Sequence, residues 1–125
     1  DSLQYAHAKG LELISGWELH GIGVQKAIER IRERIEPGVP VYVSFDIDFL
    51  DAAYAPGTGT PEIGGFTSHQ ALQLVLGTCP GLHLVGMDMV EVLPESDHAS
   101  ITSYAAAGIM HAFISVLARN RRTGM

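Results

Sequence analysis

A strand is predicted at 39–45, where a run of β-branched and aromatic residues ends in closely spaced aspartates. Apolar residues occupy both of its alternating faces, which is typical of a strand in a parallel sheet covered by helices. Asp46 and Asp48 follow directly, and side chains two apart in an extended segment point to the same side. Because ligands collect beyond the carboxyl ends of such strands, both carboxylates could reach one metal centre.

Amphipathic helices are predicted on both sides of this strand in the sequence. From 24 to 36, apolar residues recur every three or four positions and charged residues take the other face, which is typical of a helix lying on a sheet. Pro37 and Gly38 end this helix, so its connection to the strand is short, as in α/β units. A further helix begins after Thr67, which forms a capping-box pattern with Gln70.

A second buried strand is predicted at 82–90, and it too is followed by an acid, Glu91. An apolar pattern of helical period then runs from 101 to 117, and arginines follow it, as expected at the end of a long helix. If the two strands are parallel, Glu91 and Asp46 lie at the same edge of the sheet. The second strand then brings another carboxylate to the end of the first.

The first residues predict a helix at 2–9 and a short strand at 11–14. Strands therefore alternate with helices without a hairpin signal, which indicates an α/β fold with a parallel sheet. The sequence begins at Asp1, without Met and inside a predicted helix. We therefore expect residues 1–125 to be part of a single domain of a longer protein.

The longest segment without a predicted helix or strand is 47–66. It is rich in glycine, proline and threonine, and acids flank it. Glycines at 57, 59, 64 and 65 allow backbone conformations that other residues resist. Because loops of this length inside compact domains are usually functional, we expect this segment to border a site.

Composition limits the classes of partner. Eight Lys and Arg against fourteen Asp and Glu give a formal net charge of -6, so the basic surface that nucleic acid binding requires is absent, and a cationic substrate is favoured. No stretch approaches the roughly 20 apolar residues of a membrane span, so no membrane role is expected. Cys79 is the only cysteine, which excludes an internal disulfide and favours a cytoplasmic protein.

Three other sites that use closely spaced acids or glycines fit less well. An EF-hand loop beginning at Asp46 needs glycine at its sixth position and glutamate at its twelfth, where this chain has Asp51 and Gly57. A dinucleotide-binding loop at Gly57 lacks its third glycine. Phosphatases of the haloacid dehalogenase type need a lysine after the aspartates, and both lysines precede them. A solvated acidic pair that only caps a turn stays an open alternative.

The histidines form no two-histidine spacing with an acid between them. Histidines at 69, 83 and 111 are interpreted as capping or core residues, whereas His98 follows the second strand and lies nearer the predicted site. Asp88 lies inside that strand, where an unpaired charge is costly, so it needs a partner or a proton.

Several segments closely resemble the signature of the ureohydrolases, the family that includes arginase, agmatinase and their guanidino-acid relatives. The resemblance extends through nearly the whole chain. Pro61-Glu62 and the segment around 97–98 place it closer to the agmatinase and guanidinobutyrase branch than to arginase. The matching segments are SFDIDFLD at 44–51, APGTGTPEIGG at 55–65, VEV at 90–92 and DH at 97–98.

The resemblance implies a three-layer αβα fold and hydrolysis of a guanidinium group, from agmatine or a guanidino acid, to urea and an amine. It implies two Mn²⁺ ions, or Ni²⁺ in some members, with Asp46 bridging both ions and Asp48 holding one. It also implies that Glu91 binds the guanidinium and that Thr60 lines the site, and we expect His98 to contact the substrate. The complete enzymes are generally trimers or hexamers, which implies a homo-oligomer.

Two departures from the family pattern bear on this interpretation. Ala52 follows Asp51 where the family usually has proline, which loosens the turn slightly. The family's other metal ligands, a histidine and an Asp-x-His-x-Asp segment, have no counterpart here, nor does its proton-shuttling histidine. The chain therefore resembles the C-terminal portion of a ureohydrolase, and alone it offers two of the metal ligands.

Two hypotheses follow from these observations. The first is an enzyme, of which this chain forms the C-terminal part of a binuclear-metal amidinohydrolase. The alternative is a non-catalytic ureohydrolase-like subunit or fragment with a structural or regulatory role, binding metal weakly or not at all. Urea release by the full-length protein distinguishes them.

Overall fold

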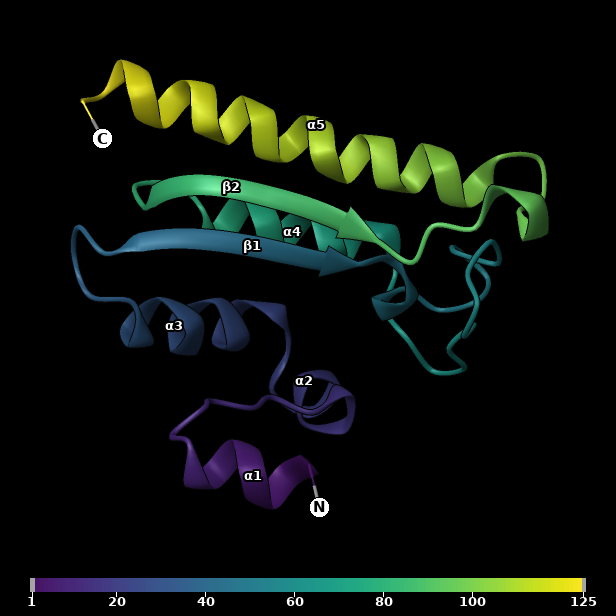
Figure 1. Ribbon diagram of the computed structural model, residues 1–125, viewed down its shortest axis with the longest axis horizontal. Coiled ribbons are helices and arrows are strands. Elements are labelled where there is room, and N and C mark those ends of the chain that lie inside the picture. Colours follow the sequence, from purple (N-terminus) through teal and green to yellow (C-terminus); the bar gives the residue numbers. More distant parts are fainter. Residues whose placement is uncertain (1, 125) are drawn as a thin grey trace.

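The computed structural model describes residues 2–124, in which helices alternate with two strands. Figure 1 shows the two strands side by side, with α4 behind them, α5 along one side and α3 along the other. In chain order the elements are α1 (Ser2–Ala8), α2 (Gly16–Ile22), α3 (Val24–Arg34), β1 (Pro40–Asp46), η1 (Ile47–Phe49), α4 (Ser68–Thr78), β2 (His83–Val90), η2 (Pro94–Ser96) and α5 (Ile101–Arg122).

The two strands are adjacent and parallel, as predicted. Asp46 pairs with Val90, the residue before Glu91. Both strands therefore end at one edge of the sheet, and loop 47–66 and the segment after β2 leave from that edge (Figure 1). The parallel arrangement places Asp46 and Glu91 at the same edge, as expected.

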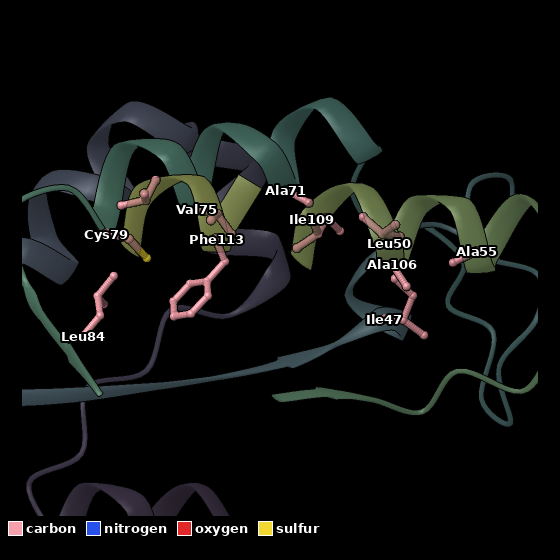
Figure 2. Packing of buried hydrophobic residues seen from close by; sticks show 11 residues of the cluster. Ile47, Leu50, Ala55, Ala71, Val75, Cys79, Leu84, Ala106, Ile109 and Phe113 are labelled. Carbon is pink, nitrogen blue, oxygen red and sulfur yellow. The ribbon is translucent and has the colours of Figure 1, made fainter. Parts of the chain in front are cut away.

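A layer of helices covers one face of the sheet. Helix α4 packs between α3 and α5, and Figure 2 shows Val75 and Phe113 of this layer beside Leu84 of β2. Val43 and Phe45 of β1 pack against the same cluster. Removal of these apolar side chains from water is the main force that holds the helices on the sheet.

The other face of the sheet is exposed in the described part of the chain, contrary to the prediction of a strand buried on both faces. Burial alternates along β1, and Tyr42 on the open face is 59% exposed. The physical reason is that α3, α4 and α5 all pack on the opposite face. Asp46 shares the open face with Tyr42 because the two are an even number of residues apart.

The strand predicted at 11–14 is absent, and residues 11–15 have no regular structure. A strand needs a neighbour for its backbone hydrogen bonds, and within residues 2–124 the sheet contains only β1 and β2. Helix α2 begins directly afterwards and was not predicted. The Ser15 hydroxyl accepts a hydrogen bond from the Glu18 N–H (3.2 Å), and this Ser-x-x-Glu spacing is a capping signature that indicates a helix start.

The capping box predicted at the start of α4 is confirmed. The Gln70 N–H donates to the Thr67 hydroxyl (3.1 Å), and the Thr67 N–H donates to the Gln70 side chain (2.9 Å). Asp88 has the partners that its position required, because the hydroxyls of Tyr42 (3.0 Å) and Ser44 (2.6 Å) both donate to it. Asp88 therefore lies in a bonded cluster on the open face of the sheet.

Helix α5 is the one helix in residues 2–124 that is long and apolar enough, by length and composition, to cross a membrane. No such stretch was expected from the sequence. Its buried residues lie on one side at helical spacing, which is typical of a helix packed against a globular core. They are Thr102, Ala106, Ile109, Phe113, Val116 and Asn120.

Candidate functional site

The two aspartates flank a residue that is buried in the core. Ile47 is fully buried, and so is Leu50; Figure 2 shows both in the cluster with residues of α5. The chain turns from β1 into η1 at this point, and the Asp48 N–H donates to Oδ1 of Asp46 (3.1 Å). The two carboxylates are therefore brought together by a turn, and not by the strand alternation on which the prediction rested.

Thr60 connects loop 47–66 to the aspartates. Its hydroxyl donates a hydrogen bond to Oδ2 of Asp48. The loop thus folds back over twelve residues to the turn from which it started. This contact places Thr60 beside the site, and it orients the Asp48 carboxylate.

Glu91 lies in an unusual backbone conformation directly after β2. Its φ of 63° is in the left-handed region, which is uncommon for residues other than glycine and costs about 1–3 kcal/mol. Its Oε2 lies 3.9 Å from the position that a Cβ on Gly59 would take. The Glu91 carboxylate therefore lies beside the loop, and strained residues of this kind cluster at functional sites.

The charges of the site are all negative. Burial raises the pKa of Asp46 above its ordinary value, and the charges of Asp48 and Glu91 raise it further, although the Asp48 N–H opposes this. The ion pairs found among residues 2–124 join Lys26 and Arg30 to other glutamates and involve none of these three carboxylates. Such a group of carboxylates attracts a cation.

The donor atoms fit a hard metal ion in type but not in number. Asp46 and Asp48 offer carboxylate oxygens, which suit Mn²⁺. However, no group of three or more His, Cys, Asp or Glu in residues 2–124 is placed to hold a metal ion. The two aspartates therefore fit one part of a metal site.

His98 is exposed, and its backbone N–H donates to Asp97 (2.9 Å). Within the described range, its side chain makes no hydrogen bond or ion pair with Asp46, Asp48 or Glu91. The structure does not bring His98 into the carboxylate group, and its contact with a substrate stays a prediction.

Asp97 closes the segment between β2 and α5. The N–H groups of Thr102 (3.0 Å) and Ser103 (3.0 Å) and the Ser103 hydroxyl (2.9 Å) donate to it. Asp97 thereby caps the first turn of α5, where the Ser100 side chain makes no capping hydrogen bond. Burial raises the pKa of Asp97, but the hydrogen bonds from Ser103 and Thr102 outweigh it and hold that pKa well below its usual range. A Cβ on Gly57 would lie 2.7 Å from the Asp97 Cβ, so loop 47–66 packs directly on this cap.

Asp97→Asn is expected to lower the free energy of unfolding of the full-length protein at neutral pH. The loss relative to wild type should be smaller in acid. An unfolded aspartate titrates near pH 3.9, and the folded pKa is lower. The wild-type carboxylate therefore stabilises the fold fully above that pH, and this contribution is lost as the pH falls toward the folded pKa. Urea unfolding at pH 7 and pH 3 measures the difference, with Glu95→Gln, an exposed acid of the same segment, as control. An equal loss of unfolding free energy at both pH values would contradict a stabilising role of the ionised Asp97 carboxylate.

The two ends of loop 47–66 are held together by Asp51 and Phe66. The N–H groups of Ala53 and Gly64 donate to the Asp51 carboxylate (both 2.9 Å) and hold its pKa below the ordinary value. The Phe66 N–H donates to the Phe49 carbonyl (3.1 Å), and the Asp51 N–H donates to the Phe66 carbonyl (2.9 Å). The turn that carries Asp48 is therefore bound to the far end of its own loop.

The contacts that two residues make in this arrangement were not predicted from the sequence. Gly57 was expected only to relax the backbone, whereas it is needed for close packing against Asp97. His20 bonds to Gly64 and stacks on Phe66, but its helix was not predicted. The Ser-x-x-Glu signature at Ser15 was the signal that would have placed His20 on a helix.

Comparisons with known proteins point to one family. A sequence profile described as the arginase family matches residues 1–115. The putative agmatinase 1 of Schizosaccharomyces pombe is 44% identical over 110 residues, covering 88% of this chain and 27% of that protein. The guanidinopropionase of Pseudomonas aeruginosa is 45% identical over 120 residues, covering 96% of this chain and 37% of that protein.

A solved structure of proclavaminate amidino hydrolase from Streptomyces clavuligerus superposes with a TM-score of 0.89 at 41% identity, over 94% of this chain and 39% of that one. The chain thus spans between about a quarter and two fifths of the length of these relatives. The structural neighbours have the αβα fold with a parallel sheet, which confirms the predicted fold class. The described residues supply two adjacent parallel strands and one layer of helices.

Proposed function

This chain belongs to the arginase family, and on that basis we propose that it forms the C-terminal part of a ureohydrolase with a binuclear metal site. The full-length protein then hydrolyses agmatine or a guanidino acid to urea and an amine. The observation that supports this most is the gathering of Asp46, Asp48 and Glu91, unpaired with any cation in residues 2–124, at the carboxyl edge of the parallel sheet.

Each residue has a separate task in this proposal. Asp46 would be a ligand shared by both metal ions and Asp48 would be a ligand of one of them, while the Thr60 hydroxyl donates to Oδ2 of Asp48. Two ions bound there supply a water molecule with a lowered pKa as the nucleophile. Glu91 accepts hydrogen bonds from the planar guanidinium, whose N–H groups match a carboxylate, and His98 contacts the substrate from the segment after η2.

The remaining ligands of the site are proposed to come from residues outside this sequence. Asp46 and Asp48 provide oxygen donors only, and in residues 2–124 no group of three or more His, Cys, Asp or Glu is placed to hold a metal ion. The oxygen donors favour two Mn²⁺ ions, with Ni²⁺ as the other candidate. We further propose that the full-length protein is a cytoplasmic homo-oligomer, a trimer or hexamer.

Urea release by the full-length protein tests this function. Agmatine, guanidinobutyrate, guanidinopropionate and arginine are each supplied with Mn²⁺, with Ni²⁺, and with a chelator as control. We expect urea from agmatine or a guanidino acid, and none with the chelator. If none of these compounds released urea with either Mn²⁺ or Ni²⁺, the proposed enzymatic function would be contradicted and the non-catalytic alternative favoured.

The 125-residue chain by itself is expected to release no urea. Two aspartates cannot fill the coordination of two metal ions, because such ions usually take six oxygen or nitrogen ligands each. The measurement is the same urea assay on the purified chain, free of any companion chain. Turnover by that sample would show that ligands outside this sequence are not needed.

A further inference from the structure

His20 joins helix α2 to the end of loop 47–66. Its Nε2–H donates a hydrogen bond to the Gly64 carbonyl (2.9 Å), 44 residues further along the chain. Its ring stacks on Phe66, with the ring centroids 4.2 Å apart and the planes 14° apart. The histidine therefore holds two neighbouring residues of the loop by two different kinds of contact.

The stack continues to the turn that carries Asp48. Phe66 stacks on Phe49 with centroids 4.5 Å apart and planes 9° apart, and Phe49 meets Phe45 edge-on at 5.7 Å. Phe49 is the residue directly after Asp48. Three parallel rings, those of His20, Phe66 and Phe49, thus form a continuous path from α2 to the aspartate turn.

Gly64 is held from both sides. Its N–H donates to Asp51 (2.9 Å), and its carbonyl accepts from His20 (2.9 Å). Its φ of 81° is left-handed, a conformation that glycine adopts without strain. Loss of the His20 contact leaves only one of these two bonds to fix the peptide groups that precede Phe66.

Helix α2 is a firm support for His20. Leu19 is buried in a cluster with Ala27 of α3 and Phe66. Glu18 pairs with Arg30 of α3, and Ser15 caps the helix. The imidazole is therefore presented from a helix that is packed on α3, so that it can restrain the loop.

We propose that His20 is a positioning residue of the metal site. By fixing Phe66 and Gly64, it keeps Phe49 in place and thereby sets the position of Asp48. The inference rests on the proposed function in one respect, the assignment of Asp48 as a metal ligand. His20 itself touches neither the metal ions nor the substrate.

Three variants of the full-length protein separate the two contacts. His20→Ala removes both the stack and the hydrogen bond, whereas His20→Phe keeps the stack alone. His83→Ala is the matched control, because His83 is also exposed and its ring N–H also donates to a distant glycine carbonyl, that of Gly38 (3.2 Å), where β2 begins. The control removes the same kind of contact at the opposite end of the sheet.

The measurements are Mn²⁺ titration of the metal-free protein by calorimetry, and hydrogen exchange of the Phe66 and Asp51 amides. For His20→Ala we expect Mn²⁺ affinity to fall about 10–100-fold, as when an outer partner of a metal ligand is lost, and both amides to exchange faster. His20→Phe should retain part of the affinity, and His83→Ala all of it. If His20→Ala does not fold, the Mn²⁺ affinity of His20→Phe is compared with that of wild type instead. The expected loss of affinity is then smaller, because His20→Phe keeps the ring stack.

Two results would overturn the proposal. Wild-type Mn²⁺ affinity in the folded His20 variants, with only their unfolding midpoint lowered, would make His20 a purely structural residue. An equal loss of affinity in His83→Ala would show that the effect is not specific to the site. Neither measurement uses a substrate, so a wild type that binds Mn²⁺ but releases no urea would refute the proposed function alone. A wild type that binds no Mn²⁺ would refute both.

Discussion

Asp46→Ala and Asp48→Ala are each expected to slow urea release by the full-length protein more than about 100-fold, beyond the loss caused by removing an outer partner of a ligand. Each change removes an oxygen donor from the proposed metal site, and Asp48→Ala also leaves the Thr60 hydroxyl without its acceptor. The measurement is the initial rate of urea formation with saturating substrate and Mn²⁺. Mn²⁺ affinity, from titration of the metal-free variants, should fall in parallel.

A nearby acid provides the control for these two variants. Asp88→Asn changes a carboxylate on the same open face of the sheet, but one that is bonded to Tyr42 and Ser44. An amide still accepts a hydrogen bond, so urea release should change little. If Asp46→Ala retained the wild-type rate while Asp88→Asn lost it, the assignment of the metal ligands would be wrong.

Gly65→Ala is expected to be among the most disruptive substitutions in loop 47–66. A Cβ at this position would lie 2.5 Å from the Asp51 backbone N and 2.7 Å from the Leu50 carbonyl carbon. These are backbone atoms, so the clash can be relieved only by separating the two ends of the loop. Overpacking of this kind costs roughly 1–3 kcal/mol or more, and the free energy of unfolding in urea measures it.

Gly108→Ala is the matched control for this substitution. The chemical change is the same, but a Cβ at Gly108 meets nothing within 4 Å, and the residue lies inside α5. Alanine is the better helix former by about 1 kcal/mol, so stability should stay equal or rise. Equal unfolding free energies for Gly65→Ala and wild type would mean that the loop ends do not pack as described.

The strands and the long helix were predictable because their patterns are local. The run at 39–45 and the helical period from 101 to 117 each carry enough apolar residues to determine an element. The strand predicted at 11–14 was wrong because a strand depends on a neighbour that a local pattern does not contain. Helix α2 is only seven residues long. The feature of the sequence that indicates it is the capping residue Ser15, and not a helical spacing of apolar residues.

The carboxylates of the site were predictable from a rule about sheets. Parallel strands end at one edge, so Asp46 and Glu91 were expected at the same edge if the two strands were parallel. The contacts that orient them were not predictable. The Thr60 bond to Asp48 and the close approach of Gly57 to Asp97 depend on the path of an irregular loop, which no residue pattern encodes.

The burial of Ile47 between Asp46 and Asp48 has a consequence for how variants of this protein are interpreted. Ile47 is fully buried at the turn that carries both aspartates, so the hydrophobic interior and the acidic site meet at this turn. Ile47→Val, a change that typically lowers the free energy of unfolding by about 0.5–1.5 kcal/mol, would also shift the peptide groups of both aspartates. A survey that scores activity alone would therefore count Ile47 among the catalytic residues, although it acts through packing alone.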